Sequence, residues 1–240
     1  MKIFTIIATF MLVSACTSTD MSNRLERGMG GIPTTQYSDA QTVEEIRKLR
    51  PQAQLPLKIA VMPPHRWQGM SLNERKVIDE WSEELKEIGF IRSLEIVPKS
   101  LIPSCGYKSE GSCYLDQSRA AAARLGADAI LFLNDSTVTD SYVNPASILN
   151  LTIVGMWIIP AHHRESFSVY EAALFDVNNG YLYAVKEGRG QSKTARPFMY
   201  VEYDTGQEEA RIKALNEVGA KLLESAKEQM EKLTPANSGA

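Results

Sequence analysis

The sequence has few of the side chains that build catalytic and metal centres. Its 240 residues include three cysteines and three histidines, and it contains no GxSxG elbow, no HExxH pair and no phosphate-binding glycine loop. The adjacent residues His162 and His163 would point to opposite faces of a strand, a poor geometry for chelation, and we interpret both as surface-loop residues. These absences predict a protein that is not an enzyme and has no metal or cofactor.

The chain also lacks an excess of positive charge and any apolar run long enough to cross a bilayer as a helix. Its formal net charge is −3, which offers no electrostatic basis for nucleic-acid binding. The two most apolar stretches, Ile3–Val13 and Ile148–Ile159, each hold about a dozen residues, whereas a spanning helix needs about 20. We therefore expect that any attachment to a membrane depends on something other than a spanning helix.

The N-terminus contains a sequence pattern that can provide this attachment. Lys2 and the apolar run Ile3–Val13 are followed by two small residues and a cysteine, in the order Ser14, Ala15 and Cys16. This pattern matches the lipobox of bacterial lipoproteins, in which residues 1–15 are removed and the cysteine is acylated. Three acyl chains exceed the two signals that stable anchoring needs. The alternative is an ordinary secretory signal with a chance cysteine.

The anchor implies a compartment and a redox state. Thr17 follows Cys16, and the lack of an aspartate there favours the outer membrane, with the domain in the periplasm. The mature chain keeps 25 Lys and Arg against 29 Asp and Glu, a net charge of −4. Because the periplasm is oxidising, Cys105 and Cys113, which seven residues separate, are predicted to form a disulfide. A metal or redox pair is the alternative.

Composition divides the chain into four parts. Residues 1–15 are the predicted signal peptide, and 16–55 are the lipidated N-terminus and a flexible tether rich in small and polar residues. The tether contains one predicted short helix near Val43–Leu49. Residues 56–233 form one predicted domain, and 234–240 a loose tail.

Apolar periodicity within this domain predicts a β-α-β-α-β order, then a hairpin, then a long C-terminal helix. The expected strands are 57–62, 94–97, 129–142, 167–177 and 181–185, and the expected helices are 72–88, 115–125 and 205–233. This order predicts an α/β fold, in which a mixed β-sheet is covered by packed helices.

Short polar motifs mark where these elements begin and end. Ser71 and Glu74 form a predicted capping box, a hydroxyl and a carboxylate that satisfy the free amides at a helix start. Asn179 with Gly180 predicts a two-residue type I′ hairpin turn, because both residues tolerate positive φ. Gly188-Arg189-Gly190 is interpreted as a turn at the end of a strand.

Five short blocks resemble, in their order and spacing, the family of rhombotarget lipoproteins: Leu115-Asp116-Gln117, Gly126-Ala127-Asp128, the six residues from Asn144 to Leu149, the four from Thr152 to Gly155, and the six from Ala172 to Val177. The resemblance covers residues 55–230. It implies a small envelope lipoprotein whose family has no established molecular activity. Some members end in a tail that rhombosortase processes, with a Gly-Gly motif, an apolar span and basic residues. This chain ends in Thr-Pro-Ala-Asn-Ser-Gly-Ala and has no such tail.

A looser, fold-level similarity links Leu57–Met62, the helix after it and the Gly-Ala-Asp-Ala-Ile block to the periplasmic α/β domains of lipoproteins such as the curli secretion factor. The apolar stretch Ile148–Ile159 is interpreted as a buried strand or core helix, or alternatively as a membrane or subunit contact. Trp67 lies in a loop, where it is either partly buried or exposed as an anchor for a partner. The candidate contact residues are Trp67, Ile148, Leu151, Ile153, Met156 and Trp157.

These features predict an outer-membrane-anchored periplasmic lipoprotein that acts as a non-enzymatic assembly or interaction factor of the envelope. Its partner would be an envelope protein or a second copy, besides the membrane that holds its lipid. One alternative is a lipoprotein that binds a small ligand or a polysaccharide, which requires a concave pocket with convergent polar groups. The last is an envelope hydrolase, which requires a Ser or Asp hydrogen-bonded to His65 or His162.

Overall fold

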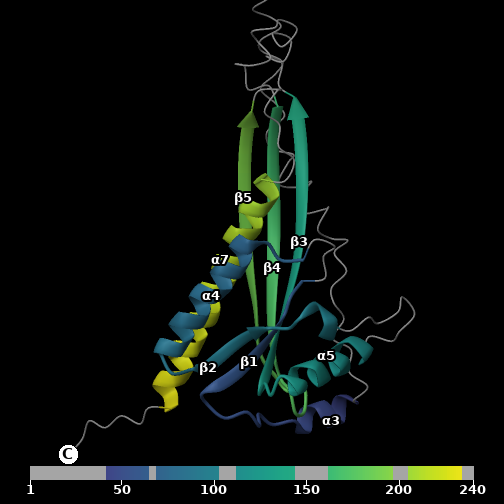
Figure 1. The fold of residues 1–240 in the computed structure, drawn as a ribbon, viewed down its shortest axis with the longest axis vertical. Helices are drawn as coiled ribbons and strands as arrows, with labels where there is room; N and C mark the ends of the chain where they lie inside the picture. The colour runs from purple at the N-terminus through teal and green to yellow at the C-terminus, as the bar shows by residue number, and fades with distance from the viewer. Residues whose placement is uncertain (1–41, 65–68, 103–111, 144–161, 197–204, 234–240) are drawn as a thin grey trace, which may run out of the picture.

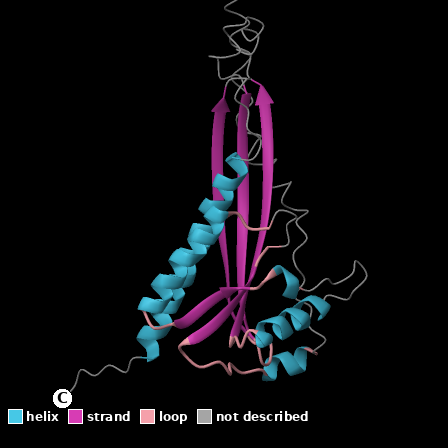
Figure 2. Cartoon of the chain, viewed as in Figure 1, coloured by secondary structure: helices cyan, strands magenta, loops and turns pink. Residues whose placement is uncertain are grey.

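A mixed five-stranded sheet organises the fold of the computed structural model, with helices on both of its faces (Figure 1). The structure describes residues 42–64, 69–102, 112–143, 162–196 and 205–233. In chain order the elements are α3 (Val43–Lys48), β1 (Leu57–Met62), α4 (Leu72–Glu87), β2 (Ile91–Ile96), the 3-10 helix η2 (Lys99–Leu101), α5 (Ser112–Arg124), β3 (Ala129–Val143), β4 (His162–Asp176), β5 (Leu182–Arg196) and α7 (Thr205–Leu233). The predicted fold class is confirmed: this is a single α/β domain with a mixed sheet, packed helices and a long C-terminal helix (Figure 2).

The strand order is β2-β1-β3-β4-β5. β1 pairs in parallel with β2 and β3, whereas β3, β4 and β5 pair antiparallel. Parallel neighbours need crossover connections, and these contain α4 and α5. Because β1 pairs with β3 only as far as Phe132, the rest of the three long strands extends beyond β1 and β2 (Figure 1). We call this extension, Leu133–Val143, His162–Ala172 and Lys186–Arg196, the arm.

The sheet separates two apolar cores. On one face, α4 and α7 bury Val77, Ile78 and Leu215 against β1, β3 and β4. On the other face, residues of α5 pack near Phe132 and Phe175, whose rings meet edge to face with centroids 5.7 Å apart. Removal of this apolar surface from water is the main stabilising contribution to such a fold.

Helix α4 begins and ends as its sequence predicts. The Ser71 hydroxyl accepts a hydrogen bond from the Glu74 amide (3.2 Å), and the Glu74 carboxylate accepts one from the Ser71 amide (2.7 Å). This is the expected capping box. After the helix ends at Glu87, Gly89 takes a φ of +73°, a left-handed conformation that glycine adopts without strain.

Two turn predictions are wrong. Gly188 and Gly190 lie inside β5 and face α7, because a Cβ at either position would overlap the helix backbone near Ala214 or Ala210. The loop between β4 and β5 spans residues 177–181, and of these only Gly180 has positive φ (+76°). A type I′ turn needs positive φ at two positions. Here Asp176 and Asn179 side chains accept loop amides instead.

The interpretation of His162 and His163 as loop residues is also wrong, because they are the first residues of β4. The strand starts five residues earlier than predicted, since the polar residues from 162 to 166 are paired with β3 on one side and β5 on the other. Backbone hydrogen bonds to the two neighbouring strands extend β4 here, and a prediction from apolar periodicity takes no account of them.

Several predicted features lie outside the described residues: the acylation site Cys16, the cysteine Cys105, and the contact candidates Trp67, Ile148, Leu151, Ile153, Met156 and Trp157. Cys113 belongs to α5, but its side chain is not described, so the disulfide stays a prediction. The short helix expected near Val43–Leu49 is confirmed as α3. In the described ranges, no helix is both long and apolar enough to cross a membrane.

Candidate ligand-binding pocket

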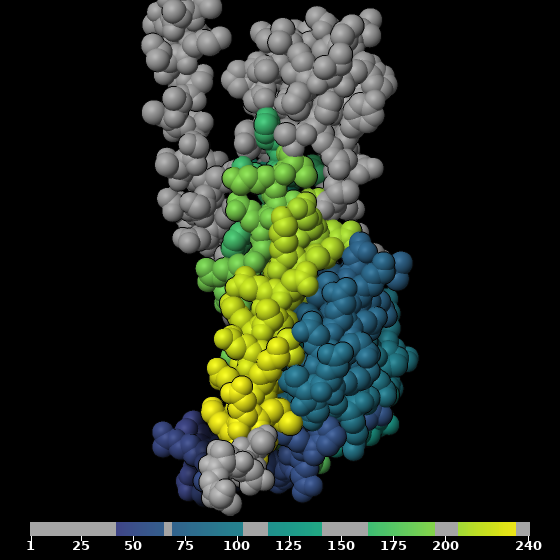
Figure 3. All heavy atoms as spheres, turned by 90° about the vertical axis from the view of Figure 1, so that its left-hand side faces the viewer, coloured from purple at the N-terminus to yellow at the C-terminus, as the bar shows by residue number. Residues whose placement is uncertain are grey.

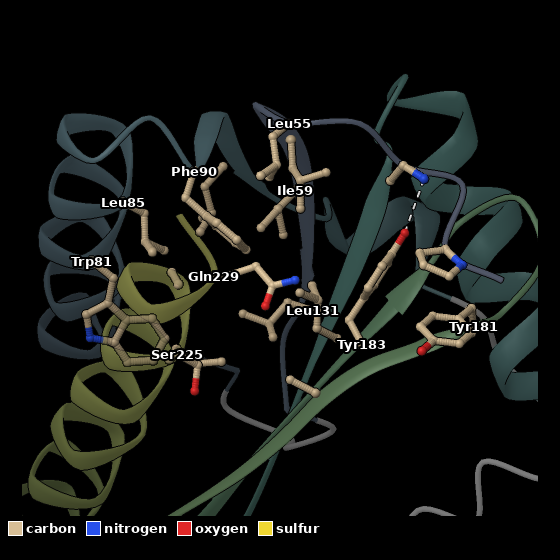
Figure 4. A pocket seen from close by; sticks show the side chains of 18 of the residues that line it. Leu55, Ile59, Trp81, Leu85, Phe90, Leu131, Tyr181, Tyr183, Ser225 and Gln229 are labelled. Carbon is tan, nitrogen blue, oxygen red and sulfur yellow. Dashed lines mark hydrogen bonds between the residues drawn. The ribbon is translucent and has the colours of Figure 1, made fainter. Parts of the chain in front are cut away.

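A cavity of about 360 Å³ lies between the sheet and the helices α4 and α7 (Figure 4). Figure 3 shows these two helices side by side on this face of the molecule. The lining residues come from the segment before β1, from α4, from the sheet and from the C-terminal half of α7: Pro51, Ala53, Leu55, Leu57, Ile59, Trp81, Leu85, Phe90, Leu94, Leu131, Leu174, Tyr181, Tyr183, Ala184, Leu222, Ser225, Ala226, Gln229 and Leu233. Its volume falls within the range of about 300–1,000 Å³ typical of ligand pockets.

The pocket lining is apolar and carries no charge. None of its residues is Asp, Glu, Lys, Arg or His, and the polar groups are two tyrosines, the Trp81 indole, Ser225 and Gln229. The Gln229 amide lies among the apolar side chains in Figure 4. A sugar polymer needs many convergent polar groups and an anion needs a cation or a nest of amides. The pocket therefore suits an apolar ligand.

One wall of the pocket is the chain segment that enters the domain, and a buried carboxylate holds it there. Asp176 is 0 % exposed. Its Oδ2 accepts hydrogen bonds from the amides of Gln52 (2.9 Å) and Ala53 (3.0 Å) and from the Tyr183 hydroxyl (2.6 Å), while Oδ1 accepts one from the Asn178 amide (2.8 Å). Buried charge is tolerated when it is hydrogen-bonded in this way. We call this contact the Asp176 latch.

The electrostatics of the latch follow from its contacts. Burial raises the pKa of Asp176, but the hydrogen bonds from Tyr183, Gln52, Asn178 and Ala53 outweigh it and hold the pKa below its ordinary value. Burial, followed by the hydrogen bond to Asp176, raises the pKa of Tyr183 to about 12. The carboxylate is therefore charged and the phenol neutral across the physiological pH range.

A second buried polar centre joins α4, β4 and α7. Glu74 of α4 accepts a hydrogen bond from the Tyr170 hydroxyl of β4 (2.8 Å), and Arg211 of α7 lies 3.4 Å from the same oxygen. Glu74 and Tyr170 are both 0 % exposed. A substrate has no access to such a carboxylate, so the centre fixes α4, α7 and the sheet to one another. Among the described residues, no group of three His, Cys, Asp or Glu could hold a metal ion.

Sequence reasoning missed both the pocket and the long-range contacts of Asp176 and Asp128. Asp176 flanks the hairpin turn, and Asp128 joins α5 to β3, where its carboxylate accepts the Lys58 amide (2.7 Å) and pairs with Arg92 (3.0 Å). The Asp176 latch joins residues more than 120 positions apart, and no local pattern reports such a contact. The contact candidates proposed from sequence lie outside the described residues.

Most of those candidates lie within residues 144–161, and the two strand residues that flank this range pair with each other. Val143 pairs with His162 at the far end of the arm, so residues 144–161 connect β3 to β4 there. The pocket, by contrast, is lined by the segment before β1, by α4, by the sheet and by the part of α7 that ends at Leu233.

Comparison with known proteins adds resemblances of fold. No protein-family profile matches the chain, and no curated protein matches it. Solved structures that are similar to this chain include a neuraminyllactose-binding hemagglutinin homologue from Helicobacter pylori, with 9% identity over 78% of this chain and 94% of that one, at a TM-score of 0.38. Bacterial lipoproteins are among them too.

One is a lipoprotein of Neisseria meningitidis, with 15% identity over 74% of this chain and 99% of that one, at a TM-score of 0.30. Another is the LpoB C-terminal domain of Salmonella enterica, with 12% identity over 57% and 84% of the two chains, at a TM-score of 0.29. Likenesses at this level carry no functional inference. Membership of the rhombotarget lipoproteins stays a prediction.

Proposed function

We propose that the protein is an outer-membrane-anchored periplasmic lipoprotein that works without catalysis, as an interaction factor of the envelope. Its domain binds its partner by taking up an apolar group in the pocket between α4, α7 and the sheet. Binding, and not chemistry, is the output. The resemblance of the sequence to rhombotarget lipoproteins agrees with this assignment.

The observation that carries the proposal is an uncharged pocket in a protein whose surface is otherwise well supplied with charge. Of the chain's residues, 23% are Asp, Glu, Lys or Arg, yet none of them lines the cavity. Apolar ligands bind in concave sites of this kind, where a few polar groups set their orientation. The same lining disfavours the polysaccharide alternative, and it contains no nucleophile–base pair that would serve a hydrolase.

A pocket-filling variant tests the proposal. Ser225 lines the pocket, whereas Ala220 lies on the exposed side of the same helix. We would isolate lipidated wild type, Ser225→Phe and Ala220→Phe from envelope membranes without harsh detergent and compare their bound partners. We expect wild type and Ala220→Phe to retain a common partner that Ser225→Phe loses. Equal recovery by all three would rule out the pocket as the binding element.

The arm supports a second candidate, in which the protein assembles through residues 144–161 with another envelope protein or a second copy. The pairing of Val143 with His162 brings both ends of this segment to the end of the arm. Deleting residues 148–159 should abolish such an assembly, measured as native mass, and should leave ligand binding in the pocket unchanged. An unaltered native mass and partner set would remove this candidate.

The anchor is tested by mass spectrometry of the mature protein. We expect cleavage before Cys16 and an acyl mass on that residue, with recovery in the outer-membrane fraction. A chain that keeps residues 1–15, or that carries no acyl group, would contradict the lipoprotein assignment.

A further inference from the structure

We infer that the ligand of the pocket is a single acyl chain. This inference rests on the proposed function and narrows it from any apolar group to one chemical class. It follows from the extent of the cavity along the sheet, from the chemistry of its lining and from the segment that forms one of its walls.

The cavity extends along the sheet. Its lining includes residues of all five strands, among them Leu94 of β2, Leu131 of β3 and Tyr183 of β5. Because β2 and β5 are the two edge strands and neighbouring strands lie about 4.8 Å apart, a ligand that contacts both Leu94 and Tyr183 must be elongated. An unbranched acyl chain is an elongated apolar group.

The lining suits an acyl chain and leaves its head group uncharged or outside. Aliphatic and aromatic side chains surround the cavity, and no charged side chain lines it. The Gln229 amide, which lies among these side chains (Figure 4), can donate an N–H to the carbonyl oxygen of an ester or a carboxyl group. We therefore expect a fatty acid and its methyl ester to bind with similar affinity.

The wall formed by Pro51, Ala53 and Leu55 belongs to the segment that precedes β1 and so lies on the N-terminal side of the domain in sequence, as does the predicted acylation site Cys16. The Tyr183 hydroxyl accepts a hydrogen bond from the Ala53 amide (3.1 Å), shown as a dashed line in Figure 4, and the Asp176 latch holds the same segment. The 27 residues from Cys16 to Thr42 span at most about 90 Å. Two sources of an acyl chain are therefore within reach: a separate lipid, and the anchor itself.

A chain-length series tests the inference. We would use the mature protein with Cys16→Ser, exported behind an ordinary secretory signal that is removed, and titrate it calorimetrically with saturated fatty acids of six to sixteen carbons below their micellar concentrations. Each methylene that enters the pocket should raise affinity about fourfold. We expect this rise to continue until the cavity is full and then to level off. An affinity that does not depend on length would overturn the inference.

Two further measurements assign the binding to the pocket. Ser225→Phe should lower affinity at least tenfold, and Ala220→Phe should leave it unchanged. On the unsubstituted chain, nuclear Overhauser contacts should link ligand methylenes to the Trp81 indole and the Tyr183 ring, which keeps the test valid if Ser225→Phe folds poorly. Fatty acids that bind without these contacts would contradict the assignment.

The design separates this inference from the proposed function on which it rests. If a naphthalene-type dye binds and Ser225→Phe blocks it, while no fatty acid binds, the pocket is a binding site but the acyl assignment fails. If neither binds, both fail. If fatty acids bind the Cys16→Ser form but not the lipidated protein in lipid nanodiscs, the anchor's own acyl chain occupies the pocket. Equal binding by both forms identifies a separate lipid.

Discussion

At the scale of single residues, the molecule depends on carboxylates that are buried and fully hydrogen-bonded. Asp176 accepts four hydrogen bonds from groups on both sides of the hairpin and from the entering segment. Asp176→Asn replaces an acceptor with a donor amide that these N–H groups cannot use. We expect it to lower the free energy of unfolding by about 2–3 kcal/mol.

The same substitution should release the entering segment. Hydrogen exchange at the Gln52 and Ala53 amides should quicken in Asp176→Asn, because their acceptor is lost. Asp116→Asn is the matched control, since Asp116 is half exposed and makes only a 3.4 Å contact with Arg119. The account of the latch is wrong if Asp176→Asn leaves both exchange and unfolding as they are in the control.

The latch also predicts how stability depends on pH. The pKa of Asp176 is lower in the folded state than its ordinary 3.8, so its contribution is present above that value and is lost as pH falls through the folded pKa. The pKa of Tyr183 is raised to about 12, so its contribution is complete below pH 10 and is lost as pH rises towards 12. An ultraviolet titration should show a tyrosine that ionises near pH 12 and is missing in Tyr183→Phe. Identical titration curves for the two proteins would refute this.

At the scale of elements, α7 can lie against the arm because both surfaces are made of small residues. Gly188 and Gly190 of β5 face Ala214 and Ala210 of the helix, and Ser192 is buried beside them. Gly190→Ala would place a methyl group against helix backbone. Overpacking of this kind costs about 1–3 kcal/mol or more. We expect denaturant unfolding to show this loss for Gly190→Ala and little change for Arg189→Ala on the exposed face.

Strand pairing within the arm places two glutamates opposite one another. Glu171 of β4 pairs with Glu187 of β5, and burial, followed by repulsion from Glu187, raises the pKa of Glu171 above its ordinary 4.5. Its favourable contribution is therefore complete below pH 4.5 and is lost as pH rises through the raised pKa. Glu171→Gln should stabilise the fold at pH 7 by a few tenths of a kcal/mol to about 1 kcal/mol.

The neighbouring pair Glu165 and Lys193 provides a control of opposite sign. These side chains also lie opposite one another, at 3.3 Å, but attract. Glu165→Gln should destabilise the fold at pH 7, whereas the gain from Glu171→Gln at pH 7 should disappear in acid. If thermal melts at pH 7 change in the same direction for both variants, cross-strand charge does not control the stability of the arm.

Element positions were predictable wherever a local rule determines them. The capping box at Ser71 and the glycine after the helix mark α4, and apolar periodicity marks β1 and α5. The rule failed at Gly188 and Gly190. Two glycines in a short run suggest a turn, but their spacing of two residues puts both on one face of a strand, where a helix presses close. To predict a strand at these glycines, one would have to know that α7 packs against β5.

At the scale of the whole molecule, the pocket was beyond sequence reasoning. Its walls include Pro51 near one end of the domain and Leu233 near the other, and each apolar lining residue is indistinguishable in sequence from an ordinary core residue. A cavity exists because side chains from several elements fail to fill the space between them, which no local pattern reports. The fold class, in contrast, follows from the order of elements alone.

The most direct test of the account is the ligand content of the protein isolated from the envelope under native conditions, with Cys16→Ser in every chain so that no acyl chain of its own can fill the pocket. Native mass spectrometry should detect one apolar molecule per domain in this form and in its Ala220→Phe variant, and none in its Ser225→Phe variant. The account is contradicted if all three proteins are empty, or if the Ser225→Phe variant carries the same molecule in the same amount.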